Sequence, residues 1–197
     1  MAENAKPISG FIKIVTAVSP IIGLGLSFFS LKCALKDHHK YSFIYQKYLP
    51  KELTFEENVK AAFLGTALIG MVVIFNFILT ILLRYATSSP NPLLKKDSEI
   101  VDLCNLIARN TIEQSIPFFT IYLAWALNLC NNENKHELFI YPLLWTLGRA
   151  IFIFGYIFQY FTKIVTLRAF GFSINVMVTL HLLVRLTGHD ILTLVKY

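Results

Sequence analysis

Charged and amide side chains interrupt the most apolar parts of this sequence, and they are the residues that could do chemistry. Inserting one charge into the centre of a bilayer costs about 2.5–3.5 kcal/mol, so such groups usually pair or face a water-filled cavity. We therefore expect a polar site enclosed by helices. The charged or titratable candidates are Arg109, Glu113, Arg149, His181, Arg185 and Asp190, and the neutral ones are Asn76 and Asn110.

The depths of these residues predict that an acid and two guanidinium groups meet at one level. At about 1.5 Å per helical residue, Glu113, Arg149 and Arg185 each lie ~20 Å from the same side of the membrane. A low dielectric strengthens the attraction between opposite charges, so we predict an ion pair between Glu113 and Arg149. Two interpretations remain open, namely a polar network that only locks the helices together and a site for an anionic or thiol ligand.

Helical spacing supports a common face for these groups. Asn110 and Glu113 are three residues apart, and Arg149 and Tyr156 are seven apart, as expected for side chains on one side of a helix. Arg109 either belongs to the site or extends along the helix to the lipid headgroups.

Composition shows which elements must position the site. Of the 197 residues, 55% are hydrophobic and 15% are charged, against about 25% charged residues in soluble domains. A spanning helix needs about 20 mostly apolar residues, and five segments qualify. We therefore predict an all-α integral membrane bundle with five spans. The segments are 8–31, 59–85, 100–130, 138–161 and 172–196.

Charge and cysteine content exclude several classes of partner. The net charge is +6, but the basic residues sit at the ends of apolar runs, where they meet headgroups, so no nucleic-acid partner is expected. They are evenly split between the two sides and do not choose an orientation. Cys33, Cys104 and Cys130 are odd in number and lack a C-x-x-C spacing, so we expect neither a disulfide framework nor a metal site. The first apolar segment is interpreted as a retained helix, with a signal peptide as the alternative.

Three stretches resemble the MAPEG family, the membrane-associated proteins of eicosanoid and glutathione metabolism. "ARNTIEQSIPFF" resembles the family's N-x-x-E-x-x-x-P helix, "GRAIFIFGY" its arginine-to-tyrosine helix, and "LRAFGFSINVMVTLHLLVRL" its last loop and helix. The likeness covers about residues 60–195. Two positions differ, because Leu106 stands where a basic residue is usual and Phe152 where a tyrosine is usual. The matching residues are Asn110, Glu113, Pro117, Arg149, Tyr156 and Arg168.

This resemblance implies a four-helix domain over 59–197, preceded over 1–58 by an extra helix and a polar connection. It also implies a homotrimer with glutathione as cofactor, bound between subunits. Arg149 and Arg168 would then be catalytic, because a guanidinium favours the thiolate form of a thiol. The glutathione- or anion-binding residues would be Asn110, Glu113 and Tyr156, to which the depth estimate adds Arg185.

Within this family, a mattrin-like branch is similar in its five spans and in an E-x-S-x-x-x-F pattern at Glu113, Ser115 and Phe119. The first functional hypothesis is therefore a non-catalytic or weakly catalytic protein of membrane trafficking or receptor regulation, with membrane lipids and a membrane receptor as partners. The second is a membrane-bound glutathione transferase or peroxidase acting on lipophilic substrates. Either would reside in the endoplasmic reticulum, Golgi or endolysosomal membranes. A small transporter is a third possibility, although no helix pair carries the Gly/Pro breaks of discontinuous helices.

Overall fold

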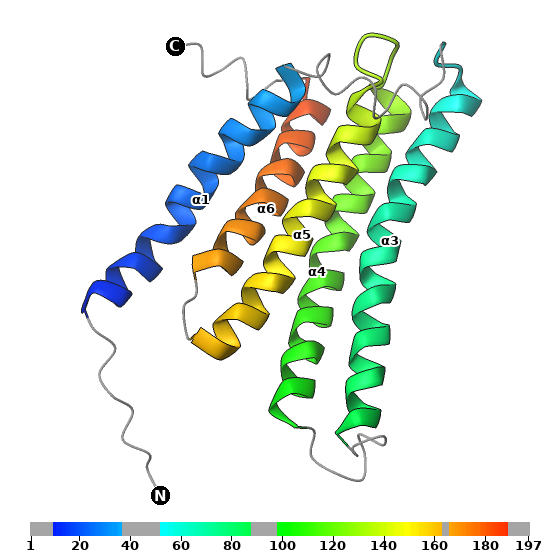
Figure 1. Cartoon of the computed structure of the whole chain (residues 1–197). Helices are drawn as coiled ribbons and strands as arrows, with labels where there is room; N and C mark the ends of the chain where they lie inside the picture. Colours follow the sequence, from blue (N-terminus) through cyan, green and yellow to red (C-terminus); the bar gives the residue numbers. More distant parts are fainter. Residues whose placement is uncertain (1–9, 37–51, 88–97, 163–165, 189–197) are drawn as a thin grey trace, which may run out of the picture.

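The computed structural model describes residues 10–36, 52–87, 98–162 and 166–188, and in these ranges the chain forms five helices and no strand. The expectation of an all-α bundle is confirmed. The helices, labelled as in Figure 1, are α1 (Gly10–Lys36), α3 (Phe55–Ala86), α4 (Glu99–Asn128), α5 (Glu137–Thr162) and α6 (Thr166–Leu186).

The helices lie side by side along one common direction (Figure 1). From α3 to α6 each helix runs opposite to the one before it, so α4 and α5 join at one end and α5 and α6 near the other. The most extensive contact is between α5 and α6, and α1 packs mainly on α6. The chain therefore forms a four-helix unit with α1 added at one edge.

Within the described residues, three helices are long and apolar enough to cross a membrane: α3, α5 and the part of α6 from Leu167. The outward face of α3 is strongly apolar, since Phe63, Met71 and Phe75 are each more than half exposed. Such a surface suits hydrocarbon and not water. The remaining spans, α1 and α4, stay predictions.

The expected bounds of the last helix are wrong at its start. The sequence predicted a span from residue 172, whereas α6 begins at Thr166. The helix ends at Leu186, before a turn at Thr187 and Gly188, and the rest of the predicted span up to 196 lies outside the described residues. The family resemblance placed Arg168 in a loop before the last helix. Gly171 instead lies inside α6, buried against α5, so Arg168 belongs to a helix and not to a loop.

Glycines bring α5 and α6 into backbone contact. A methyl group on Gly171 would lie 2.6 Å from the carbonyl oxygen of Gly148 and would also meet the backbone of Phe152. One on Gly155 would meet the backbone of Arg168. Small residues allow this close approach between membrane helices. The contact fixes how α5 presents its polar residues.

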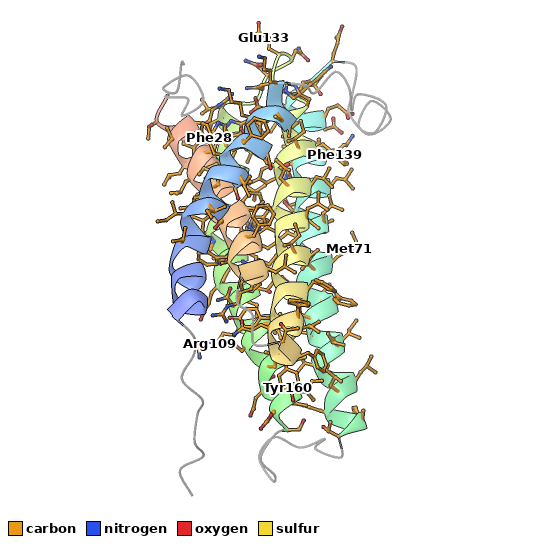
Figure 2. The ribbon with its side chains drawn as sticks, turned by 60° about the vertical axis from the view of Figure 1, so that its left-hand side comes forward. Phe28, Met71, Arg109, Glu133, Phe139 and Tyr160 are labelled. Carbon is orange, nitrogen blue, oxygen red and sulfur yellow. The ribbon has the colours of Figure 1, made fainter. Side chains whose placement is uncertain are left out.

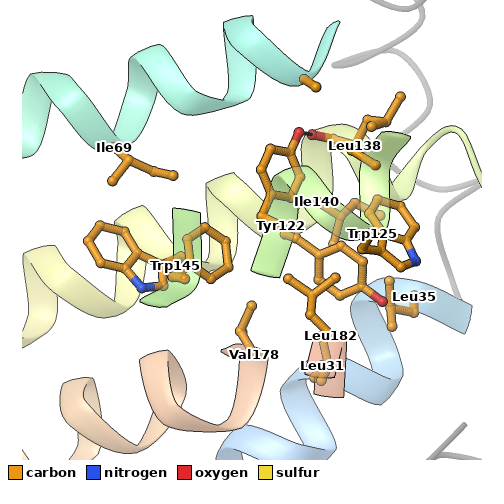
Figure 3. Packing of buried hydrophobic residues seen from close by; sticks show 14 residues of the cluster. Leu31, Leu35, Ile69, Tyr122, Trp125, Leu138, Ile140, Trp145, Val178 and Leu182 are labelled. Carbon is orange, nitrogen blue, oxygen red and sulfur yellow. Dashed lines mark hydrogen bonds between the residues drawn. The ribbon is translucent and has the colours of Figure 1, made fainter. Parts of the chain in front are cut away.

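A row of aromatic rings fills the centre of the bundle (Figure 3). Phe118 stacks on Trp145 with 5.3 Å between ring centroids, and Trp125 meets Tyr141 edge-on at 5.2 Å. The hydroxyl of Tyr122 donates to the carbonyl oxygen of Leu138 at 2.7 Å, which ties α4 to the start of α5. The extra helix is part of this core, because α1 contributes the buried side chains of Leu31 and Leu35.

Gly171→Ala should destabilise the bundle, because the added methyl group forces α5 and α6 apart. Overpacking of this kind lowers the free energy of unfolding by about 1–3 kcal/mol. A lower midpoint of thermal unfolding in detergent would report this loss. Gly70→Ala is the matched control, because nothing lies within 4 Å of its added methyl group. Equal midpoints for the two variants would contradict the close contact.

Candidate functional site

Arg149 lies in the middle of α5 and is completely buried, with 0% of its surface exposed. Its Nη1 donates to Oδ1 of Asn110 at 3.2 Å, and its Nη2 donates to Oε1 of Gln114. The two amides are four residues apart on α4 and share one face of that helix. The packing of α4 against α5 therefore surrounds a buried guanidinium group with neutral acceptors.

The predicted ion pair between Glu113 and Arg149 is wrong. Glu113 accepts a hydrogen bond from Nε of Arg109 at 2.9 Å, and the two side chains are 57% and 80% exposed. Adjacent residues on an α-helix point about 100° apart. Because Gln114 faces α5, its neighbour Glu113 turns away from Arg149, although both lie at the expected depth.

The charge of Arg149 has no carboxylate partner among the described residues, and within them its Nε also lacks a hydrogen-bond acceptor. The rings of Phe152 and Trp145 lie 4.3 Å and 5.5 Å from its Cζ atom and offer cation–π attraction. A buried charge without a counterion is costly. The arrangement is therefore suited to receiving an anion.

A groove of about 200 Å³ opens between α4 and α6 next to this guanidinium group. Gln114 lines the groove and also binds Arg149, so it stands between the groove and the charge. The other lining residues are Glu113, Pro117, Asn175, Val176, Thr179 and Leu180.

Tyr156 and Arg168 extend the site toward the start of α6. The Cζ atom of Arg168 lies 4.8 Å from the centroid of the Tyr156 ring, and that ring meets Phe152 edge-on at 4.8 Å. Phe152 in turn covers Arg149. The structure thus connects the predicted residues Arg149, Tyr156 and Arg168 in one row.

Arg185 does not belong to this group. It lies in the last turn of α6 and pairs with Glu137 at the start of α5, with 3.2 Å between Nη1 and Oε1. The prediction placed it at the level of Arg149 because it started the helix at residue 172. The hydroxyl group of Tyr141 donates to Oε2 of Glu137 at 3.0 Å, and the same oxygen lies 3.0 Å from Nδ1 of His181. Sequence reasoning missed Glu137, which closes the polar run "NNENKHE", although its spacing of four from Tyr141 was a signal.

Arg109, on the outer face of α4, lies in the half of the bundle away from Glu133 (Figure 2). Asp190, the remaining charged candidate, lies outside the described residues. Asn76 is buried on α3 and donates to the carbonyl oxygen of Val72 at 2.8 Å, away from Arg149. The polar residues therefore fall into separate places in the bundle. These are the Arg149 site, the exposed pair on α4, Asn76 on α3, and the network around Glu137 at the start of α5.

Burial makes the thiol of Cys130 a poor nucleophile. Burial raises the pKa of Cys130, in the connection after α4, to about 12, and the carboxylate of Glu137 adds to this. At neutral pH this thiol stays protonated, which makes it a poor nucleophile. Cys33 and Cys104 are free, and the described residues contain no cluster of metal-ligating side chains.

Comparison with known proteins matches residues 61–188 to the MAPEG family model. The match runs from α3 to the end of α6 and leaves α1 outside. No curated protein and no solved structure matches the chain.

Double-mutant cycles on thermal unfolding should show that Arg185 is paired with a carboxylate and that Arg149 is not. Replacing Glu137 and Arg185 by glutamine, singly and together, should show a coupling energy above about 0.5 kcal/mol, because their charges are in contact. The same cycle on Glu113 and Arg149 should show less. The reverse order of couplings would restore the ion pair expected from the sequence.

Proposed function

Because this chain belongs to the MAPEG family, whose members are membrane proteins of glutathione and eicosanoid metabolism, we propose that it binds glutathione at Arg149. It would act as a membrane-bound transferase or peroxidase on lipophilic substrates. The observation that carries this proposal is the fully buried guanidinium group of Arg149, which has amide neighbours and no carboxylate partner in the described chain.

The residues at the site fit an anionic thiol ligand. When bound, glutathione supplies the sulfur nucleophile. The positive charge of Arg149 favours the thiolate, and its burial strengthens that attraction by excluding water. Asn110 holds the guanidinium group in place, while Gln114 moves aside to admit the ligand. Arg168, positioned through the ring of Tyr156, provides a second positive charge for a ligand carboxylate.

The exposed face of α4 supports self-association as a homotrimer, in line with the family resemblance. Arg109 and Glu113 lie near the middle of α4, and the neighbouring Ile116 is 61% exposed. Leaving an ion pair against lipid is unfavourable. Further copies of the chain would cover this face and place the glutathione site close to a boundary between subunits.

A mattrin-like, non-catalytic role in trafficking or receptor regulation is the second candidate. Phe152 favours it, because its ring lies on the guanidinium group where a tyrosine would offer a hydroxyl. In that role the bonds from Arg149 to Asn110 and Gln114 would serve only to lock α4 to α5. The endoplasmic reticulum, Golgi or endolysosomal membrane is the proposed location for either function.

Glutathione should raise the thermal stability of the purified protein in a saturable way. A ligand that binds only the folded state stabilises it by about 2.7 kcal/mol at a hundredfold excess over Kd. Gln114→Glu supplies Arg149 with an internal counterion, so this variant should be more stable without ligand and should not respond to glutathione. Thermal unfolding in detergent measures both effects.

Asn128→Asp is the matched control, since it makes the same amide-to-carboxylate change at the exposed end of α4. It should respond to glutathione like the unchanged protein. No stabilisation of the unchanged protein by millimolar glutathione would refute the enzyme and leave the non-catalytic candidate.

Self-association through α4 predicts that Ile116→Cys forms disulfide-linked dimers on mild oxidation in membranes. Phe75→Cys should not, because Phe75 lies on the lipid-facing side of α3, where it is 57% exposed. Non-reducing gel electrophoresis compares both with the unchanged protein. Equal cross-linking of the two variants would argue against an interface on α4.

A further inference from the structure

Asn175 carries a buried oxygen whose hydrogen-bonding capacity is unused. The residue lies in α6 and is 1% exposed. Its Nδ2 donates to the carbonyl oxygen of Trp145 at 2.7 Å, and because a carbonyl only accepts, this bond sets the orientation of the amide. Its Oδ1 then has no partner among the described residues. Leaving a buried acceptor unsatisfied costs about 1–3 kcal/mol.

Asn175 is one of the residues that line the groove between α4 and α6. Pro117, Val176 and Leu180 make much of the remaining wall apolar. The volume of about 200 Å³ is below the roughly 300–1,000 Å³ of pockets that enclose a whole small molecule. The groove is therefore suited to a polar head and the first part of an apolar chain, whose remainder extends out of the groove.

Charges around the groove select the kind of polar head. Oδ1 of Asn175 needs a hydrogen-bond donor, which a carboxylate is not. An ammonium group would face the guanidinium group of Arg149 behind Gln114, and Arg109 already neutralises Glu113. A neutral donor, the hydroxyl group, meets both conditions.

We propose that this groove binds the hydroxyl end of a lipophilic alcohol, with Oδ1 of Asn175 accepting its hydrogen bond and its apolar chain lying along Val176 and Leu180. The inference names the kind of lipophilic ligand that this groove binds and assigns no reaction to its hydroxyl group; in that sense it rests on the proposed function. Binding of the alcohol itself does not require glutathione, because Gln114 separates Asn175 from Arg149 along the groove.

The test compares dodecanol with dodecyl methyl ether, which keeps the chain and the oxygen but lacks the donor. Thermal stability of the full-length protein is titrated with each compound in detergent. The alcohol should bind at least about fivefold more tightly than the ether, as expected when a buried acceptor gains or lacks its donor. Equal stabilisation by the two compounds would overturn the proposal without any variant having to fold.

Two variants locate the hydroxyl-binding group. Asn175→Leu should remove the preference for the alcohol. Thr179→Val should keep it, because the Thr179 hydroxyl already donates to the backbone oxygen of Asn175 at 2.7 Å. Loss of the preference in Thr179→Val alone would assign the site to Thr179 and refute the role of Asn175.

Titrating the same samples with glutathione separates this inference from the proposed function. A glutathione response without a preference for the alcohol keeps the proposed function and refutes the alcohol site. A preference that depends on Asn175, without a glutathione response, supports the alcohol site and refutes the transferase. If Asn175→Leu loses the glutathione response as well, Asn175 supports the fold and the inference fails.

Discussion

The burial of one guanidinium group constrains the whole site. Arg149 projects from α5 and is enclosed by α4 and by aromatic rings. Its neighbours must offset the free-energy cost of burying its charge. Asn110 and Gln114 do this only when their face of α4 turns toward α5. That rotation directs Glu113 outward, where it pairs with Arg109. The buried site and the exposed ion pair on α4 are thus two consequences of one interaction.

Glycine contacts transmit this constraint to α6. Gly148 lies directly before Arg149, and a side chain on it would collide with Ile174 and with the amide of Asn175. The absence of a side chain lets α6 approach until Asn175 reaches the backbone of Trp145. The close packing therefore does more than hold α5 and α6 together, because it brings a polar residue of α6 beside the groove that leads to Arg149.

Apolar run lengths were enough to predict the helices, since four of the five begin and end within five residues of their expected bounds. The fifth, α6, was misplaced because Gly171 resembles a turn residue when its contact with α5 is unknown. Depth along a helix was predictable for Arg149 and its α4 neighbours. Rotation about the helix axis was not, because periodicity shows which residues share a face and does not show which neighbour that face meets. Gln114 was missed for this reason.

Two buried polar groups in this bundle differ in their balance of charge, and that difference separates structure from function. At one end, Glu137 meets Arg185, and Tyr141 links the same carboxylate to His181, so acid and base offset each other within the chain. Such a network is complete without a ligand. Around Arg149 the acceptors are neutral amides and the described chain offers no acid. A bound anion would supply the missing negative charge, which is why we propose binding at Arg149 and not at the more extensively bonded network.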